Sequence, residues 1–135
     1  MNTPPSSNLP VQTPLIGDAN ATLFDPESIV ALGGGDLELV KRLIAGIIQS
    51  NQDDLAALEP LLAKQDRIGI AALAHRTKGT ARMINAAIVL DACHDLEVCA
   101  GHGTVAELRV KGEKYCALLQ KMEVALRDLL ARDES

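Results

Sequence analysis

The chain has 135 residues, a formal net charge of −5 at pH 7 and a hydrophobic fraction of 47%. This length provides one hydrophobic core, so a single compact domain is predicted. The acidic balance disfavours nucleic acid as the main partner, because such proteins usually present a broad basic face. With no Trp, one Tyr and one Phe, the core must be aliphatic, which favours helices over strands.

Three cysteines, Cys93, Cys99 and Cys116, lie in stretches with a helical pattern. Two of them could pair only by leaving the third unpaired, so a reducing compartment is the simplest interpretation. No apolar run approaches the roughly 20 residues that cross a bilayer, and the amino terminus has neither a basic cluster nor a hydrophobic signal core. These features predict a soluble, cytoplasmic chain.

The first 22 residues are rich in Pro, Ser, Asn and Thr. This composition cannot sustain a helix or bury a core, so residues 1–22 are predicted to be a disordered linker or tail, and residues 23–132 to be the folded domain. Such a tail indicates that the domain was joined to something larger, with a natural disordered start as the alternative.

Two helices are predicted in the first half of the domain. The first is short, with Asp25 as its N-cap and Pro26 in its first position, and the glycines at 33–35 end it. Asp36 can cap a long second helix that Pro60 should kink or break near its end. The expected apolar positions are Ile29, Val30 and Leu32 in the first helix and Leu37, Val40, Leu43, Ile44, Ile47, Ile48, Leu55, Leu58 and Leu62 in the second.

Three further helices complete the prediction. Asp66 caps the third, which runs to about Ile84, where Asn85 tolerates the left-handed conformation that closes a helix. The fourth covers about 87–100, and Thr104 caps the last. Their apolar positions include Leu90, Cys93 and Leu96, then Leu108, Tyr115, Leu119, Met122, Leu126 and Leu129. We therefore predict an all-α fold, an antiparallel up-down four-helix bundle with a short additional N-terminal helix.

The third helix places one histidine on its outer face. If the core face is centred on Ile70, His75 lies about 140° away and Gly79 about 180° away. Ala71 and Ala72 lie one turn before His75, and Gly79 lies one turn after it. A glycine inside an exposed helix costs about 0.5 to 1 kcal/mol relative to alanine. The absence of bulk on both sides indicates that another macromolecule approaches the ring closely.

Charge is also segregated around His75. Residues 67–90 contain four cations, Arg67, Arg76, Lys78 and Arg82, and no Asp or Glu. This pattern predicts a local positive field suited to an anion at the ring. Because imidazole has a large neutral fraction near pH 7, a phosphoryl group fits both features. The alternative is an ordinary exposed histidine on a solvated helix.

The stretch "AHRTKGTARMINAAIVLDACHDLE", residues 74–97, resembles the histidine-containing phosphotransfer (HPt) domain family of bacterial two-component phosphorelays. The residues that fit the family pattern are Ala74, His75, Lys78, Gly79, Ala81, Ala86, Leu90, Cys93, Leu96 and Glu97. Thr77 replaces the usual Leu on the core side. Asn85 stands where the family prefers Gly, and since Asn accepts a left-handed backbone the turn should survive. The resemblance extends more loosely from about Phe24 to Leu130.

The resemblance implies a phosphoryl carrier. His75 would accept the group from a phospho-aspartate on one receiver domain and pass it to an aspartate on another. Lys78 would lie beside the phosphoryl oxygens, Gly79 would permit docking, and Arg82, inferred from the helical wheel, would add positive charge. The chain itself would hold no cofactor or metal, because the Mg²⁺ and its acidic pocket belong to the receiver.

The expected partners are receiver domains of response regulators or of a hybrid sensor kinase. The chain would be a monomer with no nucleic acid partner and no direct membrane contact. The amino-terminal tail indicates the carboxy-terminal module of a hybrid sensor kinase, which would tether it to the inner membrane, with a free-standing shuttle as the alternative. The chain has no Gly-rich nucleotide lid and no room for an ATP-binding domain, so a carrier without autokinase activity is predicted.

Three alternatives belong to other classes. A histidine kinase phosphoacceptor domain usually has an acidic residue directly after the histidine, whereas Arg76 follows here. A metal or haem bundle could use Cys99 and His102, with Cys93 and His94 nearby, although no second ligand pair is evident. A non-catalytic helical adaptor that binds a response regulator, an inactive carrier, would leave His75 without chemistry.

Overall fold

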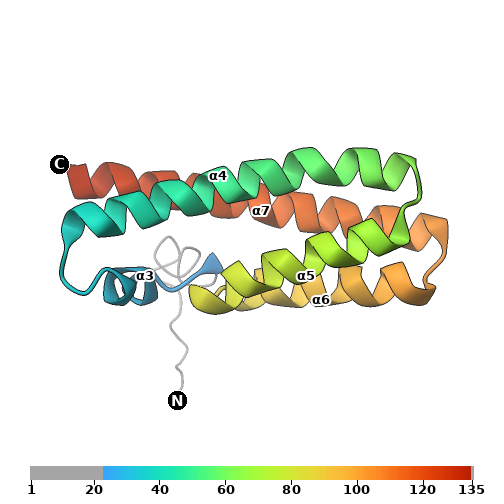
Figure 1. Ribbon diagram of the computed structural model, residues 1–135, viewed down its shortest axis with the longest axis horizontal. Coiled ribbons are helices and arrows are strands. Elements are labelled where there is room, and N and C mark those ends of the chain that lie inside the picture. The colour runs from blue at the N-terminus through green and yellow to red at the C-terminus, as the bar shows by residue number, and fades with distance from the viewer. Residues whose placement is uncertain (1–22, 135) are drawn as a thin grey trace, which may run out of the picture.

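The computed structural model describes residues 23–134. From Pro26 onward they form five α-helices, α3 (Pro26–Leu32), α4 (Leu37–Ala63), α5 (Arg67–Met83), α6 (Ala87–His102) and α7 (Val105–Glu134). The four long helices run up and down and contact one another in a closed ring, with α4 and α7 forming one pair and α5 and α6 the other (Figure 1). No strand occurs in this part of the chain. The predicted all-α bundle is confirmed, while the tail predicted at residues 1–22 lies outside the described residues.

The helix starts follow the capping residues in the sequence. Asp25, Asp36 and Asp66 each accept a hydrogen bond from a backbone N–H two or three residues further on. Thr104 and Glu107 form a reciprocal pair, in which the Glu107 N–H donates to Thr104 Oγ1 at 3.0 Å and the Thr104 N–H donates to Glu107 Oε1 at 2.8 Å. Each of these four caps satisfies backbone N–H groups that the start of a helix leaves without a partner. All four predicted caps are therefore confirmed.

Asn85 closes α5 as predicted, because its φ of 54° lies in the left-handed region. Gln65, in the turn between α4 and α5, has a similar φ of 53° that the sequence did not indicate. The break expected near Pro60 does not occur, since α4 continues to Ala63. Pro60 lies on the exposed side of the helix, where water can serve the carbonyl that its ring leaves without a donor.

The core is aliphatic, as the composition predicts. Its largest fully buried side chains are Tyr115, Phe24, Ile29, Ile44, Leu58, Ile70, Ile84, Leu96, Leu108, Leu119, Met122 and Leu126. Three predicted core residues are wrong, because Val30, Leu32 and Leu37 are 47%, 45% and 59% exposed. The short α3 turns only Ile29 inward, and Leu37 lies in the first turn of α4, at the end of the bundle (Figure 1). The predicted positions Leu43, Leu55, Leu90 and Leu129 are half-buried.

The segment around α3 covers one end of the α5–α6 pair. The Asp25 N–H donates to the carbonyl of Ile84 at 2.9 Å, and Asn85 Nδ2 donates to Ser28 Oγ at 2.6 Å. Phe24 is almost completely buried at the same place. These contacts hold the C-terminal end of α5, which is the helix that carries His75.

Candidate functional site

His75 points away from the core, as predicted. Its side chain is 70% exposed, while the opposite face of α5 is buried. Gly79 and Ala72 are exposed on the same side of the helix, and a Cβ atom added to Gly79 would meet nothing within 4 Å. No packing within the described residues therefore requires a glycine there.

An exposed apolar residue extends this face. Ile68 is 86% exposed and precedes His75 by seven residues, or about two helical turns. A groove of about 350 Å³ lies beside it, between α5 and α6. Its lining residues are Arg67, Ile68, Ala71, Glu97, Ala100 and Gly101. We call Ile68, Ala72, His75 and Gly79 the docking face.

A carboxylate from α6 lies against the imidazole. Glu97 Oε2 is 3.6 Å from His75 Nδ1, and Lys78 Nζ donates to Glu97 Oε1 at 2.8 Å. The hydrogen bond from Lys78 lowers the pKa of Glu97, and the charges of His75 and His94 lower it slightly further. Burial raises the pKa and so opposes part of this shift. Glu97 is therefore ionised at neutral pH. A negative charge on this side of the ring favours a proton on Nδ1 and leaves the lone pair on Nε2.

The cations near His75 have acidic partners that the local sequence does not show. Lys78 bonds to Glu97 of α6, and Arg76 forms an ion pair with Asp54 of α4. Lys78 is also mostly covered, since its side chain is only 11% exposed. The positive field predicted from residues 67–90 is therefore weaker than the local sequence indicates, because acids from two other helices pair with two of its four cations in the folded chain.

The other two cations of that stretch lie at opposite ends of α5. Arg67 Nη1 donates to the carbonyls of Cys99 and Ala100, each at 3.3 Å, near the end of α6. Arg82 is exposed in the last turn of α5, about two turns after His75, on the same side of the helix.

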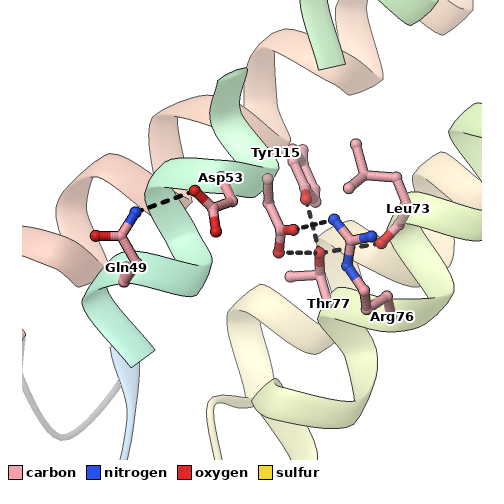
Figure 2. Close-up of polar contacts among 7 residues, drawn as sticks. Gln49, Asp53, Leu73, Arg76, Thr77 and Tyr115 are labelled. Carbon is pink, nitrogen blue, oxygen red and sulfur yellow. Dashed lines mark hydrogen bonds and ion pairs between the residues drawn. The ribbon is translucent and has the colours of Figure 1, made fainter. Parts of the chain in front are cut away.

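A buried polar cluster lies under α5, and sequence reasoning missed it. Asp54, Thr77 and Tyr115 are 3%, 2% and 1% exposed. Thr77 Oγ1 lies 2.9 Å from Asp54 Oδ2, 2.7 Å from the Tyr115 hydroxyl and 3.0 Å from the Leu73 carbonyl oxygen. Arg76 Nη2 donates to Asp54 Oδ1. We call Asp54, Arg76, Thr77 and Tyr115 the Asp54 cluster; Figure 2 shows Arg76, Thr77 and Tyr115 converging.

A signal for this cluster exists in the sequence. Asp54 interrupts the apolar stripe of α4 one turn before Leu58, so a charged residue occupies a position that should be buried. Its neighbour Asp53 is exposed and accepts a hydrogen bond from Gln49 Nε2 at 3.0 Å along the same helix (Figure 2). Only Asp54 of this pair therefore faces α5.

The cysteine and histidine residues considered for a metal occupy two places, the core and one surface groove. Cys93 lies in the core, as predicted, and burial raises the pKa of its thiol to about 12. His94, Cys99 and His102 line a surface groove of about 430 Å³ between α6 and α7. Within residues 23–134, no three His, Cys, Asp or Glu side chains gather in a way that could hold a metal ion. The metal hypothesis therefore gains no support.

These features define a class of protein, a helical bundle that presents a histidine with a carboxylate behind it on a face cleared of bulk. A family model described as "Hpt domain" matches residues 42–133, which include His75, Lys78, Gly79 and Glu97. The chain therefore belongs to the Hpt domain family. Over the described residues, no helix combines the length and apolar character that a membrane span requires.

The chain is also similar to curated sensor proteins. It is 35% identical over 95 residues to the virulence sensor protein BvgS of Bordetella pertussis, a match that covers 70% of this chain and 8% of that protein. The BvgS proteins of Bordetella parapertussis and Bordetella bronchiseptica are each 34% identical over the same length and coverage. The chain thus spans less than a tenth of the length of these relatives. No solved structure matches the chain.

Proposed function

We propose that the chain is a phosphoryl carrier in which His75 accepts a phosphoryl group from an aspartate of one receiver domain and passes it to an aspartate of another. The observation that carries this proposal is an exposed imidazole, flanked by Ala72 and Gly79, with the carboxylate of Glu97 at its Nδ1 side. Membership of the Hpt domain family supports the same function.

The transfer step follows from the tautomer that Glu97 favours. The Nε2 lone pair of neutral His75 attacks phosphorus, an N–P bond forms, and the bond between phosphorus and the aspartate oxygen breaks as the carboxylate leaves with its electron pair. The ring then carries a positive charge with a proton on Nδ1, and Glu97 stabilises that charge. The reverse attack by a second receiver aspartate regenerates neutral His75. The receiver supplies the Mg²⁺ that neutralises the phosphoryl oxygens.

Lys78, Gly79 and Arg82 have supporting roles in this proposal. Lys78 and His75 share one carboxylate, so Lys78 can turn from Glu97 toward phosphoryl oxygens when the ring becomes positive. Gly79 leaves room for the receiver backbone, and Ile68 offers it an exposed apolar contact. Arg82, further along the same side, adds positive charge near the docked partner.

Receiver domains of response regulators or of a hybrid sensor kinase are the proposed partners. The chain spans only 8% of the sensor protein that it resembles. This supports the proposal that residues 23–132 are one module of a larger hybrid sensor kinase, and it disfavours a free-standing shuttle. We place this monomeric module in the cytoplasm, tethered to the inner membrane through its parent protein. It would pass on phosphoryl groups without an ATP-binding site of its own.

The proposal is tested by intact-mass analysis of the chain after mixing with a phosphorylated receiver domain and Mg²⁺, beside the His75→Gln variant. One acid-labile phosphoryl unit on the native chain and none on the variant is the expected result. Binding of the receiver that persists in His75→Gln, without any adduct on the native chain, would instead identify an adaptor.

A further inference from the structure

The Asp54 cluster has a defined direction of hydrogen bonding. Burial raises the pKa of Tyr115 above its ordinary value, so the phenol keeps its proton. The phenol donates to Thr77 Oγ1, because the single hydroxyl proton of Thr77 is directed to Asp54. Thr77 donates its own proton to Asp54, since a carboxylate only accepts, and shares it with the Leu73 carbonyl. Arg76 donates to the other oxygen of Asp54. Four side chains from α4, α5 and α7 are thus joined in one connected network.

This network grips α5 directly beside His75. Arg76 is the next residue, and Thr77 lies about 200° around the helix from His75, so it holds the helix from the side opposite the imidazole. Glu97 and Lys78 connect the other side of α5 to α6. A rotation or slide of α5 would therefore stretch the bonds of Thr77 and Arg76 to Asp54.

Stability alone does not account for a carboxylate at this place. The Asp54 carboxylate is buried although its partner Arg76 is 62% exposed. Burying a charge costs desolvation that the attraction of its partner often only offsets, and an apolar side chain of similar volume can replace such a group without loss of stability. A fully satisfied polar network instead specifies one arrangement of the helices it joins. In this chain, the arrangement it specifies is the rotation of the histidine helix.

We propose that Asp54 and Thr77 are positioning residues of the phosphotransfer site, which fix the rotation of α5 and thereby hold His75 against Glu97 with Nε2 presented on the docking face. The inference rests on the proposed function of His75. Neither residue touches the phosphoryl group; both act through the backbone of α5.

Two substitutions of Thr77 separate its hydroxyl from its shape. Thr77→Val keeps the branched shape and removes the hydroxyl, whereas Thr77→Ser keeps the hydroxyl and removes a methyl group. In single-turnover transfer at a range of receiver concentrations, Thr77→Val should lower the maximal rate about tenfold, because small misplacements of reacting groups are costly. Thr77→Ser should transfer at close to the native rate. A native transfer rate in Thr77→Val would overturn the proposal. Slower transfer in Thr77→Ser than in Thr77→Val would also overturn it, because that order is expected if only the packing of the methyl group matters.

A second readout needs no phosphoryl donor. The ¹⁵N chemical shifts of the His75 ring give the share of neutral imidazole protonated on Nδ1. This share should fall in Thr77→Val and in Tyr115→Phe, which removes only the phenol hydroxyl. In both variants it should move toward the share measured in Glu97→Gln, which lacks the negative charge beside Nδ1. Ile29→Val is the control, because Ile29 is fully buried in α3 and outside the Asp54 cluster. Unchanged ring shifts in both cluster variants would overturn the proposal.

The two readouts also separate this inference from the proposed function. If the native chain accepts no phosphoryl group, the proposed function fails while the ring shifts still report whether the Asp54 cluster positions His75. If the native chain transfers normally and the cluster variants do too, only the positioning proposal fails.

Discussion

His75 and Lys78 share one carboxylate, and in the proposed transfer this sharing would give the site its response to a phosphoryl group. Glu97 Oε1 accepts from Lys78 at 2.8 Å, while Oε2 lies 3.6 Å from the ring. In that proposal, a phosphorylated, positive ring would draw Glu97 more strongly to His75. The ammonium group of Lys78 would then be free to face the new phosphoryl oxygens.

Lys78→Met tests this role, because methionine keeps an unbranched apolar stem and removes the charge. Transfer to His75 should slow by about 10²-fold, the usual cost of losing one charged donor to a transition state. The free energy of unfolding should fall by only about 1 kcal/mol. Rapid-quench transfer and urea unfolding measure the two quantities. A large loss of stability with native transfer would make Lys78 a structural residue.

The lowered pKa of Glu97 predicts a dependence of stability on pH. A carboxyl group whose pKa is lower in the folded state contributes stability that is complete above its unfolded pKa of about 4.3 and is lost as pH falls through the folded pKa. The native chain should therefore exceed Glu97→Gln in stability by a constant amount above about pH 5. This difference should shrink toward acid pH in chemical unfolding. A difference that grows below pH 4 would contradict the lowered pKa.

The inner side of α5 is held by side-chain contacts, whereas its outer side lacks bulky side chains near His75. Thr77 and Arg76 fasten it to Asp54, and the contact of Asn85 with Ser28 fastens its end to α3. On the outer side, Gly79 leaves open space. In the proposed transfer, a docking receiver would therefore meet a fixed histidine on a helix that does not have to rearrange.

Gly79→Leu should separate docking from folding. The Cβ atom of a leucine there would meet nothing within 4 Å, and leucine improves helix propensity by about 0.8 kcal/mol, so the melting temperature should hold or rise while transfer falls. Gly46→Leu is a matched control, because Gly46 is an exposed glycine of α4 with equally open space. It should be as stable as Gly79→Leu and transfer normally. Equal transfer rates in the two variants would rule out docking over Gly79.

The turn after α5 should tolerate glycine better than alanine. Asn85 has a φ of 54°, and a side chain with a Cβ atom in that region costs about 1 kcal/mol. Alanine keeps this cost without the local hydrogen bonding that lets asparagine accept the region, whereas glycine removes the cost, so Asn85→Gly should exceed Asn85→Ala in free energy of unfolding by about 1 kcal/mol. Ser28→Ala measures separately the hydrogen bond from Asn85 Nδ2. Equal stability of the alanine and glycine variants would contradict the backbone argument.

Across the whole molecule, the features that the sequence predicted are local or periodic. The caps at Asp36 and Thr104, the left-handed Asn85 and the outward His75 each depend on residues within a turn or two. Such features survive because tertiary packing adds to them. The bundle itself followed from the spacing of apolar residues.

The contacts that sequence reasoning missed depend on which helix faces meet. Glu97 is 22 residues after His75, and Asp54 is 22 residues before Arg76, so no local pattern brings them together. The exposed Leu37 was missed for a related reason, since its spacing matches the core stripe but the bundle ends beside it. Helical periodicity gives the side of a helix that is buried. It does not give which other helix packs against that side, nor how far along the helix the packing extends.

Site localisation tests the central claim most directly. The chain contains three histidines, His75, His94 and His102, and all three are exposed. After transfer from a phosphorylated receiver, fragmentation mass spectrometry at neutral to alkaline pH should place the phosphoryl group on His75 alone, with His94→Gln and His102→Gln modified as fully as the native chain. A phosphoryl group on His94 or His102 would contradict the account. So would a phosphorylated native chain in which His75 is unmodified.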